Sequence, residues 1–309
     1  MSRRPLRYRR GADVALDRPA HVRAASALAW VGGRLLVVQD DAAFLGVVEP
    51  ATGLVDDVVL PTVNGRRVFD KALGNKADKP DLEAAFADGE TLVACGSGGP
   101  QPARRVVITW RAGEAPKVLE AGRFLDAVGR AILPAATALN LEGAALVDGE
   151  VWLANRGGDR DGEAVSPDAI VTVELAAWRA YLADPAHAPV PALSATRVEL
   201  GSLEGCPLHF AELVAAPSGV YYLAAAEATA SYFDDGAVVG SVLGLLRAGA
   251  ARYTPVLDEE GVVARDKLEG LAAVPGVPGR WFAVVDADDP DRPADLLELS
   301  LAGDSVLQQ

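Results

Sequence analysis

Four glutamates occupy one position of a recurring sequence motif, and their carboxylates are the first candidates for chemistry. Glu83, Glu142, Glu212 and Glu269 each stand after a short entry segment and before small apolar residues, and Ser26 takes this position in a weaker first copy. If the fold gathers these carboxylates, each pair about 6 Å apart repels by about 3 kcal/mol at an effective dielectric constant of about 20. We therefore expect a cation or bound protons to balance the charge.

Calcium is one cation that suits these side chains. It binds roughly six to eight oxygen atoms from carboxylates, carbonyls and amide side chains. The glutamates together with Asn155 and Asp286 offer oxygens of this kind. The sequence thus indicates a Ca²⁺ site whose ligands are Glu83, Glu142, Glu212, Glu269 and Asn155.

Lysine side chains are an equally good source of positive charge. Lys71, Lys76 and Lys79 fall within one short stretch, and Lys267 stands two residues before Glu269, although lysine is rare in this chain. A lattice of lysine and glutamate side chains would neutralise the same region without a metal ion. Both alternatives stay open at this point.

Further residues beside the glutamates complete a candidate site. His209 precedes Glu212 by three residues and is suited to act as a general base. We assign catalytic roles to His209, Lys76, Lys79 and Lys267. The lysines are expected to bind an anionic substrate. The residues from which we expect contacts to the substrate are Lys71, Arg156, Glu227 and Asp286.

The motif recurs five times and predicts the fold. Its copies begin near residues 24, 81, 140, 209 and 267, and each holds two strands joined by a tight turn, followed by a third and usually a fourth strand. Four-stranded antiparallel units repeated around a ring are typical of a β-propeller. We expect an all-β fold in which residues 1–309 form a single propeller of five blades, with six blades as the alternative. Residues 6–16 are expected to supply the outer strand that the last copy lacks.

Loop lengths indicate which face of this propeller carries the site. The turns between first and second strands are minimal, whereas the loops after the second strands, and the connection 64–81, are longer and polar. The glutamates begin their strands on the same face as these long loops. Because functional residues concentrate on elaborated loops of a rigid scaffold, we expect the site there. The stretches 123–132 and 176–182 are expected to be helical additions to the ring.

Composition limits the class of partner. The chain has 309 residues, a formal net charge of −14 and a pI of about 4.7. An acidic surface repels nucleic acid and anionic membranes, so we expect neither, and a small-molecule substrate instead. Two cysteines cannot build a disulfide framework, and the N-terminus lacks the apolar segment of a signal peptide, so a cytoplasmic location is expected. Nothing in the sequence indicates an oligomeric state.

Several motifs resemble those of known propeller proteins. The entries DLE (81–83), NLEG (140–143) and KLEG (267–270) resemble the Asp-Leu-Glu-Gly blade entries of phytase-like, "esterase-like" β-propeller proteins. The segments LGNKADKPDLEA, AAAE and VVDADDPDRPADL are similar to those of an uncharacterised bacterial family. This resemblance covers nearly the whole chain and implies a propeller fold, but it implies no particular activity.

A more distant resemblance leads to the gluconolactonase, regucalcin and paraoxonase propellers. In those families, glutamate and asparagine side chains of inner strands hold a calcium ion at the channel mouth. The resemblance implies that Glu142, Glu212, Glu269 and Asn155 play these parts here. Those propellers have six blades and draw asparagines from several of them, whereas this chain has five copies and one asparagine so placed.

These features favour a calcium-dependent hydrolase of a small phosphoester, ester or lactone, with its site at the mouth of the central channel. One alternative is a non-catalytic propeller that binds a small ligand or a protein on the same face. Another is a metal-free enzyme in which lysine and glutamate serve as acid and base. The sequence leaves the choice between enzyme and binding protein undecided, and it indicates no organic cofactor.

Overall fold

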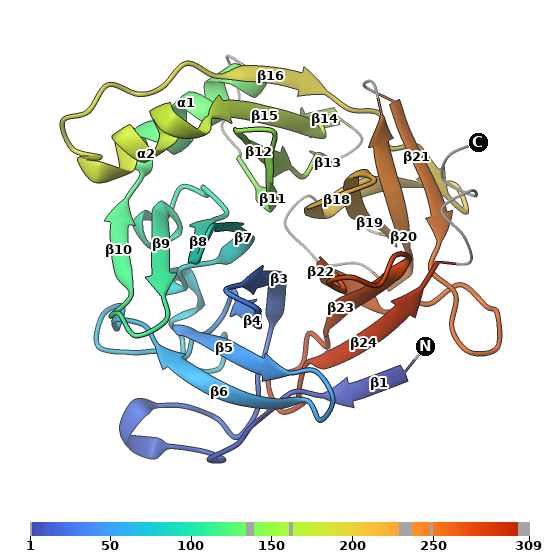
Figure 1. Ribbon diagram of the computed structural model, residues 1–309, viewed down its shortest axis with the longest axis horizontal. Helices are drawn as coiled ribbons and strands as arrows, with labels where there is room; N and C mark the ends of the chain where they lie inside the picture. The colour runs from blue at the N-terminus through green and yellow to red at the C-terminus, as the bar shows by residue number, and fades with distance from the viewer. Residues whose placement is uncertain (1, 134–138, 161–162, 229–236, 248–249, 302–309) are drawn as a thin grey trace.

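Five sheets stand around a central axis in the computed structural model of this chain (Figure 1). The structure describes residues 2–133, 139–160, 163–228, 237–247 and 250–301. Each sheet is a blade with four antiparallel strands, of which the first lies nearest the axis. The prediction of an all-β propeller with five four-stranded blades is confirmed, and the six-bladed alternative is wrong.

The first three blades follow one another along the chain. The strands of blade 1, from the axis outward, are β3 (Ala25–Val31), β4 (Arg34–Gln39), β5 (Phe44–Glu49) and β6 (Leu54–Val59). Those of blade 2 are β7 (Leu82–Asp88), β8 (Thr91–Gly96), β9 (Val106–Arg111) and β10 (Lys117–Glu120). Those of blade 3 are β11 (Leu141–Val147), β12 (Glu150–Asn155), β15 (Ala169–Glu174) and β16 (Ser194–Arg197).

Blades 4 and 5 complete the ring. The strands of blade 4 are β18 (Cys206–Ala216), β19 (Gly219–Ala228), β20 (Ala237–Arg247) and β21 (Ala250–Pro255). Those of blade 5 are β22 (Lys267–Ala273), β23 (Arg280–Asp286), β24 (Asp295–Ser300) and β1 (Ser2–Pro5). Three shorter additions are β2 (Arg7–Tyr8) beside β6, β17 (Ser202–Leu203) beside β18, and the hairpin of β13 (Gly158–Arg160) and β14 (Glu163–Ser166).

The N-terminal segment closes the ring, but with different residues from those expected. The outer strand of blade 5 is β1, which pairs with β24, whereas the expected segment 6–16 contributes only β2, which runs parallel to β6 of blade 1. Charge explains this choice, because Arg3 of β1 pairs with Asp266 at 2.7 Å and with Asp295 at 3.0 Å. The basic N-terminus is therefore a closing strand matched to an acidic blade edge.

Two helices and three 3₁₀ turns connect the strands. The helices are α1 (Gly122–Ile132) and α2 (Leu175–Ala183), and the 3₁₀ turns are η1 (Val14–Leu16), η2 (Lys76–Asp78) and η3 (Pro102–Arg104). The helices cover the outer side of blades 2 and 3, where Phe124 and Trp178 pack with their ring centroids 4.6 Å apart. Other apolar clusters fill the spaces between neighbouring blades, as blade stacking requires. Within the described residues, no helix has the length and apolar character needed to cross a membrane.

The innermost strands approach one another so closely that only small residues fit. A Cβ atom added to Gly143 would lie 2.5 Å from the backbone nitrogen of Leu213 in the next blade. A Cβ atom on Gly270 would lie 2.8 Å from the backbone nitrogen of Leu28. The small residues that follow the motif glutamates therefore serve the packing of the axis.

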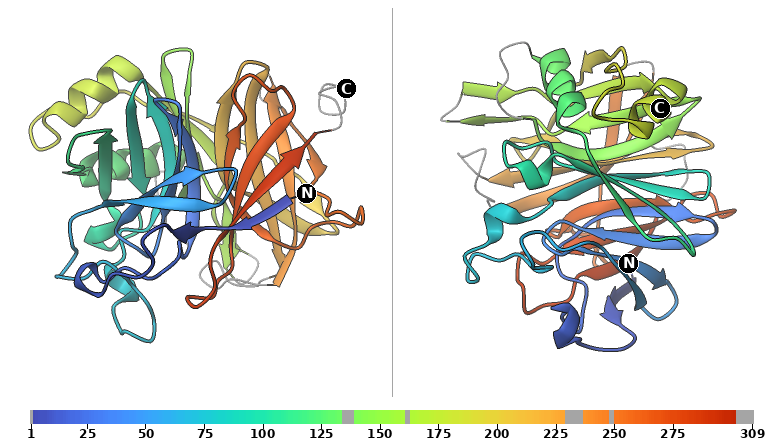
Figure 2. Two further views of the ribbon diagram at one scale, coloured as in Figure 1. Left: turned by 60° about the horizontal axis from the view of Figure 1, so that its bottom comes forward. Right: turned by 90° about the vertical axis from the view of Figure 1, so that its left-hand side faces the viewer.

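The two faces of the ring differ in their loops. In the left view of Figure 2, short hairpins point upward, while the long connection before β7 and the loop between β23 and β24 hang from the lower side. We call these sides the hairpin face and the loop face. The first strand of every blade begins on the loop face, so side chains at these strand starts meet at one end of the axis.

Candidate functional site

Charged side chains gather at the loop-face end of the axis. We call this group the axial cluster. Its acidic members are Asp40, Asp81, Glu83, Glu142, Glu227, Glu269 and Asp286, and its basic members are Lys79, Arg104, Arg156 and Lys267. Most of them come from the starts of the first strands and the ends of the second strands. The repeats therefore place these acidic side chains at one end of the axis.

Strand pairing explains how the glutamates of blades 2, 3 and 5 reach the axis. The register between first and second strands shifts by one residue at the same level of every blade. The residues at this shift are Ser26, Glu83, Glu142, Ala211 and Glu269. A residue in such a bulge is left out of the ladder, and its side chain is re-aimed.

Blade 4 departs from this pattern. Its shift falls at Ala211, so Glu212 pairs with Leu223 and stands one residue deeper along the axis than the other glutamates. The prediction that Glu212 holds the equivalent position is wrong, because the sequence motif aligns blade 4 one residue out of register. The Glu212 side chain is fully buried, and its Oε1 accepts a hydrogen bond of 2.8 Å from the backbone N–H of Leu213.

Lys79 is the cation of the blade 2 side. It follows η2, and its Nζ contacts a carboxylate oxygen of Asp40 and lies 2.5 Å from Oδ1 of Asp81. Arg104 approaches Asp81 Oδ2 at 3.0 Å, and the hydroxyl of Ser97 donates to the same oxygen. Asp81 reaches this position from a left-handed backbone conformation with φ of 52°. Burial raises the pKa of Glu83 well above its usual range, and the charges of Asp40 and Asp81 act in the same direction.

Glu142 of blade 3 stands between an arginine and an asparagine. Its Oε1 accepts a hydrogen bond of 2.6 Å from Asn140 and lies 3.7 Å from Nη1 of Arg156. Arg156 in turn binds Glu227 of blade 4 at 2.6 Å. Burial raises the pKa of Glu142 to about 8; the Arg156 charge opposes this rise and the charge of Glu269 adds to it. Glu142 is thus a carboxyl group that exchanges its proton near neutral pH.

Blade 5 contributes a lysine with three acidic neighbours. Lys267 Nζ lies 3.2 Å from Oε1 of Glu269 and 3.6 Å from Oδ1 of Asp288. The third neighbour is Asp286, whose Oδ1 accepts a hydrogen bond of 2.9 Å from the backbone N–H of Asp288. Burial raises the pKa of Asp286 to about 8, the nearby Asp40 raises it further, and Lys267 opposes the shift.

The site residues expected from the sequence divide into two groups. Lys79, Lys267, Arg156, Glu227 and Asp286 all join the axial cluster. Lys71 and Lys76 do not, because both are exposed in the long loop before β7. Only the third lysine of that stretch turns inward.

Asn155 serves the backbone of blade 3. Its fully buried amide nitrogen donates to Ser166 and to the carbonyl oxygens of Arg156 and Pro167, and its Oδ1 accepts from the N–H of Asn140. Both ends of the amide are therefore occupied by the fold. Asn155 holds the start of the blade 3 loop and offers no free oxygen to a metal ion.

His209 forms a pair that spans blades 3 and 4. Its Nδ1 lies 2.8 Å from Oδ2 of Asp168, and Asp168 Oδ1 accepts backbone hydrogen bonds of 3.0 Å from Gly157 and Phe210. These bonds fix the carboxylate, which in turn fixes one nitrogen of the imidazole ring. The sequence motif does not point to Asp168, because this residue precedes the third strand of a different blade.

The side chains predicted to bind calcium do not form a set of ligands that fits a calcium ion. Among the described residues, the acidic, histidine and cysteine ligand atoms that meet in a group of three within 4.8 Å belong to Asp40, Asp81 and Glu83. Lys79 Nζ lies against Asp40 and Asp81, and Arg104 and Ser97 occupy the other oxygen of Asp81. Lys79 and Arg104 therefore supply positive charge to this part of the axis.

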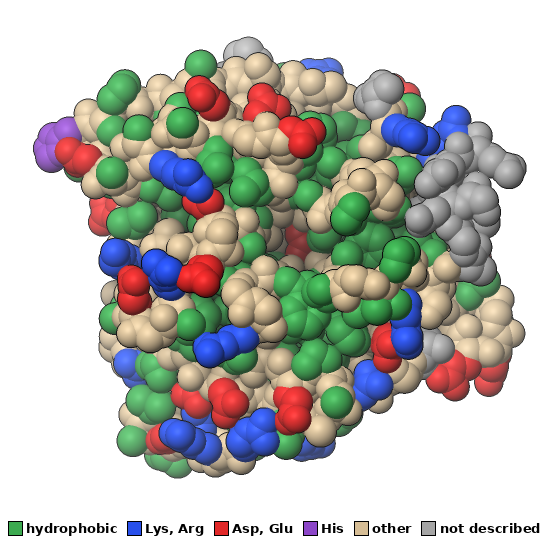
Figure 3. Space-filling view, viewed as in Figure 1, with side chains coloured by type: hydrophobic (Ala, Val, Ile, Leu, Met, Phe, Trp, Pro, Cys, Tyr) green, Lys and Arg blue, Asp and Glu red, His purple; other side chains and the backbone are tan. Residues whose placement is uncertain are grey.

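The hairpin face offers a different kind of surface. Figure 3 looks onto this face and shows hydrophobic side chains around a hollowed centre, with an acidic side chain deep inside it.

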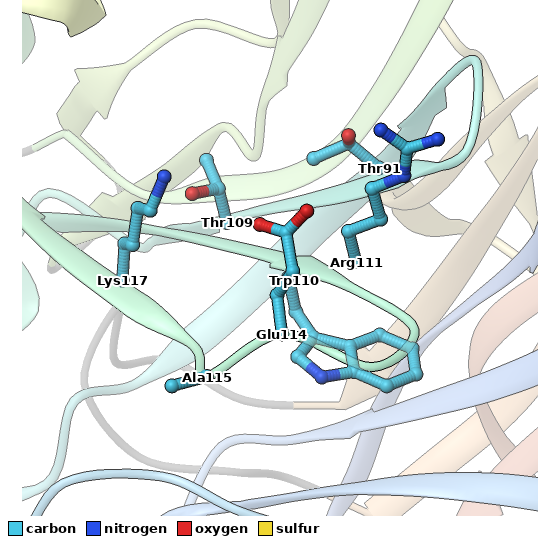
Figure 4. Close-up of a pocket in the computed structure, with 7 residues that line it drawn as sticks. All are labelled: Thr91, Thr109, Trp110, Arg111, Glu114, Ala115 and Lys117. Carbon is cyan, nitrogen blue, oxygen red and sulfur yellow. The ribbon is translucent and has the colours of Figure 1, made fainter.

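Figure 4 shows a small depression of about 170 Å³ on the outer part of blade 2, lined by Thr91, Thr109, Trp110, Arg111, Glu114, Ala115 and Lys117. Its charges of both signs lie away from the axial cluster, at the edge where β9 turns into β10.

Comparisons with known proteins place this chain in a family. No curated protein matches this sequence. The glutaminyl cyclase of Myxococcus xanthus is similar in structure, with 14% identity, a TM-score of 0.44, and coverage of 97% of this chain and 96% of that one. The allergen Mala s 1 of Malassezia sympodialis has 12% identity, a TM-score of 0.46, and coverage of 94% and 96%. At these scores neither structure bears on activity. Residues 21–301 match the model of a family of unknown function (DUF6929), and the chain belongs to this family.

Proposed function

We propose that the loop-face end of the axis is the active site of a metal-independent hydrolase that cleaves a small ester or lactone. The observation that carries this proposal is Glu142, a buried carboxyl group at the axis whose pKa is raised to about 8. A proton-transfer group works best when its pKa lies near the working pH. Strongly shifted groups in contact with charged partners are also enriched at functional sites.

Glu142 is the general base in this proposal. It takes a proton from a water molecule, and the oxygen of that water attacks the carbonyl carbon of the substrate. Arg156, 3.7 Å from Glu142, and Lys267 are the cations close enough to stabilise the negative charge that develops on the carbonyl oxygen. Their hydrogen bonds to carboxylates hold both cations in place before the substrate arrives.

Asp286 is the general acid. Both carboxyls have a pKa of about 8, and the active form is the one in which Asp286 holds its proton while Glu142 is ionised, a form most populated near pH 8. Asp286 gives its proton to the alkoxide that leaves when the ester C–O bond breaks. Glu142 and Asp286 stand on blades 3 and 5. Two carboxyl groups of similar pKa thus divide the acid and base roles without a metal ion.

An ester or a lactone suits this cluster better than a phosphoester. Lys79, Arg156 and Lys267 are each already paired with carboxylates, so a doubly charged phosphate would compete with those partners. A neutral ester or lactone requires stabilisation only of the single negative charge that develops on its carbonyl oxygen during the reaction. The excess of acidic over basic groups in the axial cluster points in the same direction.

The test is turnover of a panel of aryl esters and lactones, with added calcium and with a chelator. We expect hydrolysis that the chelator does not reduce, and a loss of about 10²- to 10⁴-fold in kcat for Glu142→Gln, which removes the base. Glu150→Gln is the matched control, because Glu150 is exposed at the hairpin end of β12 in the same blade. It should leave the rate unchanged.

Two results would contradict the proposal. Turnover that disappears with the chelator and returns with calcium would favour the metal-dependent alternative. Ligand-dependent increases in melting temperature without turnover on any substrate would favour a non-catalytic binding protein.

A further inference from the structure

Two buried carboxylate oxygens on neighbouring strands lack a hydrogen-bond partner. They are Oε2 of Glu212 on β18 and Oε2 of Glu269 on β22, and neither finds a donor within the described part of the chain. The exposed fractions of the two residues are 0% and 6%. Strands β18 and β22 are adjacent in the ring, and the two carboxyls interact electrostatically. A buried acceptor without a donor is unfavourable by roughly 1–3 kcal/mol and calls for an explanation.

The first explanation to consider is a cation, and the protein supplies one only to Glu269. Lys267 lies 3.2 Å from Glu269 Oε1, and Arg156 adds its charge from blade 3. The other charged groups facing Glu269 are Glu227 and Glu142. Glu212 has no ion pair among the described residues, and it faces Glu269 and backbone N–H groups of Leu213, Leu28 and Ala144.

Solvent and metal ions are the remaining external partners, and neither fits. The unpartnered oxygens of both residues are closed off from bulk solvent. Within the described chain, Glu212 and Glu269 belong to no group of three oxygen, nitrogen or sulfur ligands that converge on one point. A calcium ion needs roughly six to eight oxygens, and two carboxylate oxygens do not supply its coordination.

A single proton satisfies both atoms. We propose that Glu212 is a neutral carboxylic acid with its proton on Oε2, and that it donates a hydrogen bond toward Oε2 of Glu269. Oε1 of Glu212 remains the acceptor for the N–H of Leu213, as its 2.8 Å bond requires. Glu269 stays ionised on Lys267. One shared proton, and not a metal ion, then balances this pair of carboxyls.

Burial acts in the direction that this arrangement needs. It raises the pKa of Glu212 well above its usual range, and the three backbone N–H groups only partly oppose that effect. The charge on Glu269 adds to the rise, because two like charges side by side in a buried site are unfavourable. A carboxyl that keeps its proton at neutral pH can act as a hydrogen-bond donor in the way an amide does.

The protonated Glu212 also has a consequence for Glu142, and this step alone rests on the proposed function. While Glu212 holds the proton, Glu269 is negative, and that negative charge raises the pKa of Glu142. Glu212 is therefore a positioning residue that acts through Glu269 on the general base. Losing the charge of Glu269 should lower the pKa at which Glu142 releases its proton.

Glu212→Gln tests the proton directly, because an amide reproduces the shape and the donor of a carboxylic acid. We expect its melting temperature at pH 7 to stay within about 2 °C of the wild type. Glu212→Ala, which leaves the N–H of Leu213 without an acceptor, should melt roughly 3–5 °C lower. Glu227→Gln is the matched control, since Glu227 pairs with Arg156 at 2.6 Å and should tolerate the amide less well.

Infrared spectroscopy gives a second readout that needs no activity. At about pH 9, where Glu142 and Asp286 are largely ionised, the difference spectrum of wild type minus Glu212→Gln should show the C=O stretch of a protonated carboxylic acid. The pKa of buried Glu83 is also raised, but its contribution is common to both proteins and cancels in the difference. Absence of this band, or destabilisation by Glu212→Gln as large as by Glu212→Ala, would overturn the proposal. So would a calcium-dependent rise in melting temperature that Glu212→Gln removes.

The link to the general base has its own test. In a variant Glu269→Gln, the lower limb of the pH–rate profile should move to lower pH, whereas Glu212→Gln should leave it in place. If the infrared and melting experiments do not give the expected results, the shared proton is refuted. Failure to find any turnover refutes only the proposed function and leaves those results unchanged.

Discussion

The two ends of the propeller axis bury different kinds of side chain. At the loop-face end, Lys79, Arg156 and Lys267 are surrounded by carboxyl groups from all the neighbouring blades. At the hairpin-face end, apolar residues surround the axis (Figure 3), and Trp30 packs near Phe282 with ring centroids 6.4 Å apart. Both ends are built by the same five strands, so the difference lies in the residues and not in the backbone.

Along each innermost strand, the residues that pack the blades therefore lie at the hairpin end, and the charged residues lie at the loop-face end. Small and apolar residues near the hairpin end stack the blades, and each can be exchanged for another of similar volume at modest cost. The loop-face end instead confines charges that depend on one another, because removing any one of them leaves its partner buried and uncompensated. The raised carboxyl pKa values of Glu142 and Asp286 belong to that end.

The largest effect should come from removing a cation of the loop-face end. Lys79→Met leaves Asp40 and Asp81 without the ammonium group that both contact, and we expect a loss of about 3–5 kcal/mol in the free energy of unfolding. Lys117→Met, on the exposed outer strand of the same blade, should change stability by less than about 0.5 kcal/mol. Urea denaturation of both variants measures the difference.

A double variant shows whether charge or packing is responsible. Adding Asp40→Asn to Lys79→Met should recover part of the lost stability, because it removes one of the two stranded charges. If the double variant were less stable than Lys79→Met alone, the loop-face end would be held by packing like the hairpin end, and the contrast between them would fail.

The second test uses pH. The pKa of Glu142 is raised from 4.5 to about 8, and that of Asp286 from 3.8 to about 8. A carboxyl with a raised pKa in the folded state stabilises that state fully below its unfolded pKa, and this contribution is lost as pH rises through the folded value. We therefore expect stability to fall between about pH 4 and pH 8, by several kcal/mol in total, since each pKa unit corresponds to about 1.4 kcal/mol.

Variants at the two ends should change this curve differently. Glu142→Gln and Asp286→Asn should each flatten the fall, because they remove a group that binds a proton on folding. Phe282→Leu, at the hairpin end, should lower stability by the same amount at every pH. Chemical denaturation in a series of buffers provides the comparison, and a slope unchanged by both carboxyl variants would contradict the assigned pKa values.

The sequence predicted the blade architecture well, because repeated motifs fix both the number of blades and the face on which their strands begin. It failed where one residue decides the outcome. The neighbours Ala211 and Glu212 can each be aligned with the motif, and only strand pairing reveals that Ala211 takes the shifted position. The closing strand escaped prediction because it is four residues long and its signal is charge rather than hydrophobic pattern.

Partners contributed by loops outside the motif were equally hard to foresee. Asp168 meets His209 across the boundary between blades 3 and 4, and Arg104 meets Asp81 from a loop of its own blade. Neither contact follows from the spacing within a single repeat. Lys79 was foreseen as part of a lysine stretch, but the same reasoning included Lys71 and Lys76, which the fold leaves exposed.

The smallest expected effect concerns exposed ion pairs at the rim of the ring. Comparing them with the buried ion pairs of the axial cluster tests whether burial distinguishes the loop-face end. Arg3 of the closing strand pairs with Asp266 and Asp295, but its side chain is 40% exposed. Arg3→Glu should lower the free energy of unfolding by about 1 kcal/mol at low salt, and Arg10→Glu, at another exposed position of the N-terminal segment, by less. Added salt should abolish the effect of Arg3→Glu, because exposed charges are screened, and leave that of Lys79→Met nearly intact. Equal salt sensitivity of the two variants would mean that the axial charges are as open to solvent as those of the rim.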